Sequence, residues 1–170
     1  MRPLRLRGVL FLMNSTDLTA FIAAHHIAAK IIHLSDHTPT VETAAQALGV
    51  AVEQIGKSIL FLADGSPVLV IANGVNRIDY KGLADYFGLS RKRIKMATAD
   101  EVLDFAGYTV GSMPPFGHKT KLRTLIDSRL FTQSEIFAGG GDIDALLRIT
   151  PDEIMRATAG ERVELTEPAS

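Results

Sequence analysis

The sequence predicts a single domain of the mixed α/β (α+β) class, with a twisted, mixed and mostly antiparallel sheet surrounded by helices. Its 170 residues suffice for one sizeable core, and 46% apolar with 22% charged residues is typical of a folded domain. Helix and strand patterns alternate, yet a hairpin signal at 56–72 and closely spaced strands after residue 122 depart from regular βαβ repeats. We expect the domain at 15–167, after a disordered N-terminal extension at 1–14.

Two helices and one strand are predicted at the start of this domain. The polar cluster at 15–17 is a good helix N-cap and precedes helically spaced apolar residues, which predicts an amphipathic helix over 18–29. A short run of β-forming residues predicts a strand at 30–34. Residues 41–48 are rich in alanine and are followed by Gly49, the stop signal of a short helix.

The clearest local signal is a β-hairpin. Apolar β-type runs at 56–63 and 67–72 flank an Asp-Gly pair at 64–65, which is typical of a tight turn between two antiparallel strands. A helix is predicted next, over 79–87, because a glycine follows it directly, and a short strand is predicted at 94–97.

The last third of the domain returns to strands after one helix and one irregular loop. A capping-box pattern starts a helix over 98–106. Two glycines and two prolines prevent regular structure between 108 and 118. Strands are predicted at 122–126, 134–138 and 143–149. Proline at its first position starts a final helix at 151–159, and an edge strand is expected at 162–165.

The composition excludes several classes of site. The chain has no cysteine, which excludes disulfides, thiolate metal sites, iron–sulfur clusters and a cysteine nucleophile. A net charge of −1 removes any argument from bulk charge for binding nucleic acid or an anionic membrane. No apolar run approaches the roughly 20 residues that span a bilayer. We expect a cytoplasmic protein with no cofactor, no bound metal and no membrane partner.

Lys57 is a candidate functional residue because it begins an apolar strand. Strand alternation places it on the same face as Ile59 and Phe61. A lysine there either lies at the rim of the sheet with its ammonium in water, or points into a polar pocket where it meets an anion. The residue pattern by itself leaves both readings open.

Two glycine-containing segments are further candidates. Prolines stiffen the loop 111–118, glycines bend it, and it carries Met113, Phe116 and His118, which favours a rigid pocket wall over an ordinary surface loop. The run 139–141 lacks the Lys-Ser/Thr pair of a phosphate-binding loop and leads into another β-type run. It either lets a ligand approach its backbone N–H groups closely or forms a flexible hairpin loop.

Positive charge gathers locally although the total charge is near zero. Four basic residues lie within five positions: Arg91, Lys92, Arg93 and Lys95. Such a cluster either contacts the phosphates of a nucleic acid or forms a solvated face.

In combination, these features resemble the YbaK/ProX family of aminoacyl-tRNA deacylases, editing domains related to the insertion domain of bacterial prolyl-tRNA synthetase. The resemblance covers about residues 16 to 166 and rests on four ordered segments, namely 40–50, 54–61, 111–118 and 139–141. Their combination is fairly specific, whereas no single one of them would be.

The resemblance implies a cleft that takes the aminoacylated 3′ end of tRNA. Lys57 matches the functional lysine of the family, and Gly111 to Pro115 match the Gly-x-x-x-Pro loop that lines its amino-acid pocket. We expect Lys57 to act in catalysis and the basic cluster to bind nucleic acid. The expected substrate-binding residues are Gly111, Met113, Pro115, Phe116, Gly117, His118, Gly139, Gly140, Gly141 and Asp142.

The implied function is trans-editing, the hydrolysis of a small amino acid from the 3′ end of mischarged tRNA, expected to be of the tRNA(Pro) type. Backbone N–H groups near Gly111 and 139–141 would stabilise the oxyanion, and Asp142 and His118 would orient water or the α-amino group. Met113, Pro115 and Phe116 would set the pocket size. An aminoacyl-tRNA synthetase is a further expected partner. The alternatives are a non-catalytic module that binds tRNA ends or a synthetase, and a hydrolase of small esters or amides.

Overall fold

The computed structural model describes residues 12–35, 38 and 40–167, so residues 1–11 of the predicted extension lie outside the described residues. The end of the predicted extension belongs to the fold. The Met13 N–H donates to the Gly107 carbonyl (2.8 Å), and the Asn14 side chain caps the first helix by accepting from the Thr16 N–H (2.9 Å). Folded structure therefore begins before residue 15.

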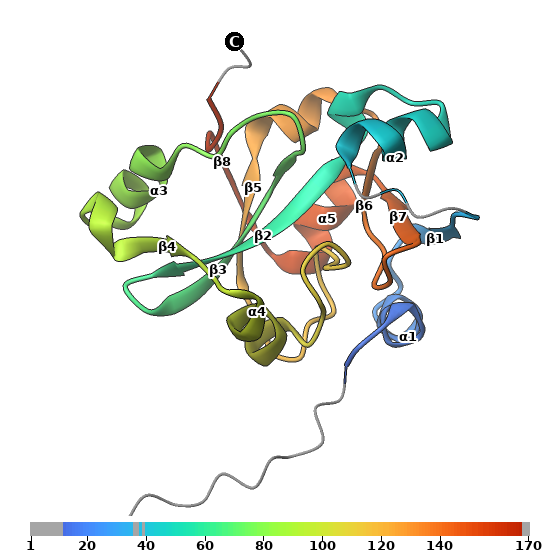
Figure 1. Cartoon of the computed structure of the whole chain (residues 1–170), viewed down its shortest axis with the longest axis horizontal. Helices are drawn as coiled ribbons and strands as arrows, with labels where there is room; N and C mark the ends of the chain where they lie inside the picture. The colour runs from blue at the N-terminus through green and yellow to red at the C-terminus, as the bar shows by residue number, and fades with distance from the viewer. Residues whose placement is uncertain (1–11, 36–37, 39, 168–170) are drawn as a thin grey trace, which may run out of the picture.

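Five α-helices and eight strands form within the described residues (Figure 1). The helices are α1 (Ser15–Ala24), α2 (Val41–Leu48), α3 (Tyr80–Phe87), α4 (Ala99–Ala106) and α5 (Pro151–Thr158). The strands are β1 (Ala29–His33), β2 (Gly56–Ala63), β3 (Ser66–Asn73), β4 (Ile94–Met96), β5 (Arg123–Asp127), β6 (Ile136–Gly139), β7 (Ala145–Ile149) and β8 (Glu161–Val163). In the described ranges, no helix has the length and apolar character needed to cross a membrane.

The predicted class is confirmed, but the strands form two sheets rather than one. The larger sheet has the order β4-β2-β3-β5-β8, with antiparallel pairing around β2 and parallel pairing on both sides of β5. The smaller sheet, β1-β7-β6, is antiparallel throughout. The two sheets separate because β6 and β7 pair with β1 and not with β5. An isolated bridge between Ile55 and Phe137 links them beside the first residue of β2.

Local signals explain most element boundaries. Helix α2 begins at a Thr40 cap, whose hydroxyl accepts from the Thr43 N–H, and ends at Gly49 with φ +67°, a left-handed conformation that glycine adopts without strain. The first helix is shorter than predicted. It ends at Ala24 because Ala29, the first residue of β1, is already paired with Ile149. Pairing between strands thus ends the predicted apolar helix early.

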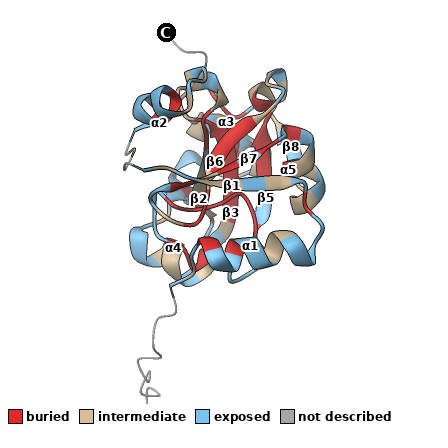
Figure 2. Cartoon of the chain, turned by 90° about the vertical axis from the view of Figure 1, so that its right-hand side faces the viewer, coloured by how far each residue is buried: buried red, intermediate tan, exposed pale blue. Residues whose placement is uncertain are grey.

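The main core is shared by both sheets and by α1, α4 and α5. Figure 2 shows the buried strands enclosed by helices whose outer faces are exposed. The irregular loop 108–118 contributes three buried side chains to this core, Tyr108, Met113 and Phe116. Side chains packed in this way hold a loop without regular structure in one position. The loop is therefore a fixed wall of the cavities beside it.

Candidate functional site

A cavity of about 310 Å³ lies at the start of β2, where the larger sheet meets the smaller one. Four regions of the chain line it: the N-terminal end of α2, the first residues of β2, the loop at 110–113, and the paired strands β6 and β7. The residues that line it are Thr38, Thr40, Val41, Ala44, Ile55, Gly56, Lys57, Ser58, Ile59, Val110, Gly111, Met113, Gly139 and Leu146. Lys57, Gly111, Met113 and Gly139 are the sequence-predicted residues among them.

Lys57 enters the cavity from the second position of β2, opposite Ala72 of β3. Gly74 leaves room for its aliphatic stem, because a Cβ at Gly74 would lie 3.2 Å from Lys57 Cε and clash with Val41. The Lys57 side chain is exposed, and it forms no ion pair with any described residue. Its ammonium is free to meet an anion. The N-terminal end of α2 adds partial positive charge to the same cavity.

Ser58 is a functional candidate that sequence reasoning missed. Its Oγ is the one buried side-chain polar atom in the described part of the chain that has no hydrogen-bond partner. An unpaired buried hydroxyl is unfavourable by about 1–3 kcal/mol, and most such groups in proteins find a partner. Ser58 is one of the residues that line the Lys57 cavity, which makes its hydroxyl a candidate hydrogen-bond partner for a bound ligand. The burial of this hydroxyl and its lack of a partner distinguish Ser58 from other serines, and neither property can be read from the sequence.

The glycine turn 139–141, which starts at the last residue of β6, holds the loop 111–113 in place. A Cβ at Gly139 would clash with the Met113 carbonyl and lie 3.1 Å from the Ser112 carbonyl oxygen, so only glycine lets the two backbones approach this closely. The Gly141 N–H donates to that same Ser112 carbonyl (2.9 Å). Gly111 itself has φ +90°, the left-handed region that favours glycine. These contacts fix the position of the loop beside Lys57.

The residues that follow Gly139 do not line the Lys57 cavity. The Gly140 N–H donates to Ala145 O (3.0 Å), and the Gly141 N–H is engaged with the loop. The Asp142 carboxylate accepts from the Ser15 N–H (3.2 Å) at the start of α1. This corrects the expectation that these two N–H groups and this carboxylate face the substrate, because each is bonded within the fold.

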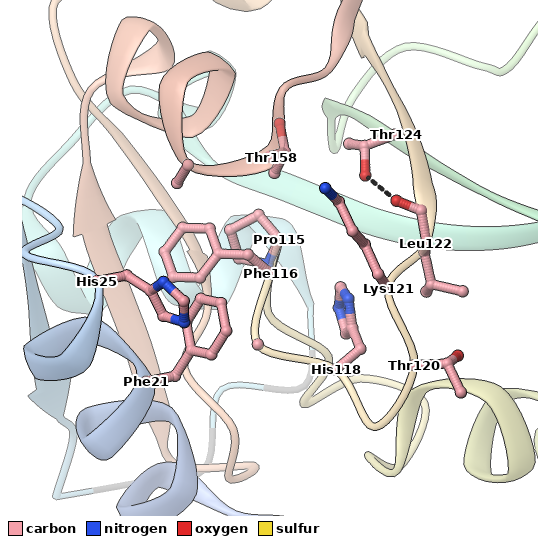
Figure 3. A pocket seen from close by; sticks show the side chains of 12 residues that line it. Phe21, His25, Pro115, Phe116, His118, Thr120, Lys121, Leu122, Thr124 and Thr158 are labelled. Carbon is pink, nitrogen blue, oxygen red and sulfur yellow. Dashed lines mark hydrogen bonds between the residues drawn. The ribbon is translucent and has the colours of Figure 1, made fainter.

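The second half of the 111–118 loop lies at a different cavity. Pro115, Phe116, Gly117 and His118 line a space of about 310 Å³ between α1, α5 and the start of β5 (Figure 3). His118 Nε2 lies 2.7 Å from the Pro114 carbonyl oxygen, which can only accept, so Nε2 carries the proton. Burial lowers the pKa of His118 to about 4. His118 is therefore neutral near pH 7, and its hydrogen bond to Pro114 stabilises the loop.

The basic cluster lies at the opposite end of β2 from Lys57. Lys92, Arg93 and Lys95 line a third cavity there, and Lys95 pairs with Leu62, five residues along the strand from Lys57, or about 17 Å at the usual rise. Two members already have partners. The Arg91 guanidinium lies 4.1 Å from the centre of the Tyr80 ring. Arg93 pairs with Asp64. The structure does not bring this cluster to the rim of the Lys57 cavity.

Comparison with known proteins identifies relatives of the chain. The family model of the aminoacyl-tRNA editing domain matches residues 35–157. YwhH of Bacillus subtilis (strain 168), described as uncharacterized, is 32% identical over 116 residues, which are 68% of this chain and 72% of YwhH. The proline–tRNA ligase of Maridesulfovibrio salexigens is 30% identical over 109 residues; these cover 64% of this chain and only 18% of the ligase.

Solved structures share the fold over most of the chain. A crystal structure described as a proposed trans-editing enzyme for prolyl tRNA synthetase has a TM-score of 0.83 and 31% identity, covering 91% of this chain and 97% of that one. The hypothetical protein APE2540 has a TM-score of 0.82 and 27% identity, covering 89% and 99% of the two chains.

Proposed function

Because the chain belongs to the aminoacyl-tRNA editing domain family, we propose that it deacylates mischarged aminoacyl-tRNA in trans, with a small amino acid as the acyl group. One observation supports this most directly. Lys57, whose ammonium forms no ion pair with a described residue, and Ser58, whose buried hydroxyl has no described partner, both line one small cavity that the loop 111–113 helps to form. A tRNA 3′ end offers the matching groups, since it presents a phosphate, an ester carbonyl and an α-amino group together.

The reaction is the addition of water to an activated ester. The water oxygen attacks the ester carbonyl, the C–O bond to the ribose breaks, and the ribose oxygen leaves with a proton, so that a free amino acid and an uncharged tRNA result. In this proposal Lys57 holds the terminal phosphate or the ester region by charge-assisted hydrogen bonds. Ser58 binds the ester or the amino group. The protein supplies no thiol, and the proposed water attack needs none; the neighbouring ribose hydroxyl assists it.

The size and walls of the cavity support a small amino acid. Apolar side chains of Val41, Val110, Met113 and Leu146 contribute to a lining that encloses about 310 Å³. That volume lies at the lower end of the roughly 300–1,000 Å³ typical of small-molecule sites, and the terminal ribose must share it. A separate hydrolytic site for small side chains has a physical purpose, because one methylene discriminates substrates by only about 1–3 kcal/mol in a synthetase.

Deacylation of mischarged tRNA tests the proposal. Alanyl-tRNA(Pro) is incubated with the wild type, with Lys57→Ala and with Lys30→Ala, a matched change of an exposed lysine on β1. We expect Lys57→Ala to lower the rate by at least about tenfold, because a charged hydrogen bond contributes about 1.5–3 kcal/mol, and Lys30→Ala to leave it unchanged. Equal rates for all three proteins would remove Lys57 from the reaction. If the wild type binds the aminoacyl-tRNA but does not hydrolyse it, the alternative of a non-catalytic module that binds tRNA ends would be favoured.

A further inference from the structure

The second cavity has a wall of stacked rings. Phe21 lies on α1 and His25 is the C-cap of that helix; the centroids of their rings are 4.1 Å apart. Phe21 also stacks on Phe116 of the loop, with the ring centroids 5.8 Å apart and an interplanar angle of 24°. Figure 3 shows these rings gathered on one side of the cavity and Lys121 on the other. Phe21 is half-buried and His25 is exposed, so the stack is open to a ligand. A flat aromatic ligand can extend such a stack.

Lys121 is the only lysine or arginine among the described residues that line this cavity, and none of them is an Asp or Glu. Its side chain is exposed and forms no ion pair with any residue that the structure describes. His118 adds no charge near pH 7, because burial lowers its pKa to about 4. Lys121 therefore supplies the one permanent positive charge of the described lining, which matches an anionic group on a ligand.

Three threonines and His118 of the lining can act as hydrogen-bond acceptors. Thr120 Oγ1 donates its proton to Phe105 O (2.7 Å), Thr124 Oγ1 to Leu122 O (3.1 Å) and Thr158 Oγ1 to Ile154 O (2.7 Å). Their oxygens keep acceptor capacity. His118 uses Nε2 on the Pro114 carbonyl, which leaves Nδ1 as an acceptor. A fitting ligand thus also carries N–H or O–H donors.

From these three features we propose that the second cavity binds a nucleoside monophosphate. The base lies against the accessible rings of the wall, Phe21 and His25, with the buried Phe116 behind them. The phosphate meets the Lys121 ammonium, and the ribose hydroxyls or a base amino group donate to the threonine and histidine acceptors. A free nucleotide and an unpaired nucleotide of an RNA strand present the same base, ribose and phosphate. The site requires no aminoacyl ester, so it stands independently of the proposed deacylation.

Calorimetric titration with AMP and adenosine tests the free-nucleotide source. The measurements use Lys57→Ala as the background, so that binding at the first cavity does not contribute. We expect AMP to bind more tightly than adenosine, and Lys121→Gln to weaken AMP binding about tenfold by removing a charged hydrogen bond. Phe21→Leu is expected to weaken both ligands. Lys119→Gln, a change of a nearby exposed lysine outside the lining, is the matched control and leaves both affinities unchanged.

An uncharged RNA hairpin with an unpaired 3′ end, compared with its blunt-ended form, tests the RNA source in the same background. Binding that needs the unpaired end and is weakened by Lys121→Gln and Phe21→Leu, but not by Lys119→Gln, supports the proposal with RNA as the source. Thermal unfolding of each variant shows that it is folded. The proposal is overturned if neither AMP nor the hairpin binds, or if Lys121→Gln and Phe21→Leu bind both as the parent does.

Discussion

Lys57 and Ser58 are consecutive residues of β2, and both line the first cavity although alternation turns their side chains to opposite faces of the strand. The cavity lies at the start of β2, and the lining includes the first four residues of the strand, 56–59. Lys57 contributes an exposed positive charge without an ion-pair partner among the described residues. Ser58 contributes a fixed, buried hydroxyl, which suits it to position a ligand.

Substitution Ser58→Ala separates a ligand-binding role from a structural one. The hydroxyl has no partner in the unliganded protein, so we expect its removal to leave the free energy of unfolding unchanged or slightly increased. Deacylation should fall about five- to twentyfold in kcat/KM if the hydroxyl binds substrate. Urea unfolding and single-turnover deacylation measure the two effects. Unchanged kcat/KM would show that Ser58 does not contact the substrate.

At the scale of elements, the glycine turn 139–141 at the end of β6 and the loop 111–113 act as one unit. The loop is irregular, yet it is fixed by the backbone contact at Gly139, by the hydrogen bond from Gly141 to Ser112, and by Phe116 in the core. The role of the glycines is therefore to allow close packing between two backbones. The proposed catalysis in the first cavity would depend on this packing because the same loop forms one of the cavity walls.

Replacing Gly139 by alanine should displace that wall. The new Cβ would meet the Met113 carbonyl, a backbone group, and we expect a loss of about 1–3 kcal/mol in stability and at least about tenfold in deacylation. Gly88→Ala is the matched control, because Gly88 has φ +65°, a Cβ there would have no neighbouring atom within 4 Å, and the residue lies beyond both cavities. It should lower stability by about 1–2 kcal/mol through backbone strain alone and keep full activity. Full activity of Gly139→Ala would contradict the role of the turn.

At the scale of the whole molecule, the buried His118 makes stability depend on pH. The pKa of His118 is about 4 in the folded protein, because burial disfavours the charged ring, and about 6.5 when unfolded. The unfolded state therefore binds more protons between these values, and stability present above pH 6.5 is lost as the pH falls toward 4. Glu153 also contributes to stability, because the hydrogen bond from Arg156 is the main cause that lowers its pKa from 4.5 to about 2. This stabilisation is lost as the pH falls from about 4.5 toward 2.

Urea unfolding at pH 7 and pH 4.5 measures this loss, and Glu153 adds little to it because its stabilising effect is lost mainly as the pH falls below about 4.5. We expect the wild type to lose on the order of 2 kcal/mol between the two pH values. The variant His118→Gln, whose amide can still donate to the Pro114 carbonyl, should lose clearly less free energy of unfolding between the two pH values. Equal losses in the two proteins would show that another group carries the pH dependence.

Much of the fold was predictable because its signals are local. Thr40 and Gly49 mark the ends of α2, and the Asp-Gly turn sets the hairpin of β2 and β3. Lys57 was predictable as a candidate because a lysine in an apolar strand is unusual. Ser58 was not, since a serine in a strand has no signal until burial and missing partners are known. The first helix was predicted too long because the pairing of Ala29 with β7 lies 120 residues away in the sequence.

By itself, the sequence determined the fold class, the element types, and the candidates Lys57, Gly111 and Gly139, because caps, turns and strand patterns act over a few residues. Only the tertiary structure decided which of these candidates share a cavity. It divided the 111–118 loop between two cavities, since Phe116 packs into the core and turns Pro115–His118 away from Lys57. It also placed the basic cluster at the far end of β2. Such placements depend on packing between distant segments, which no local pattern encodes.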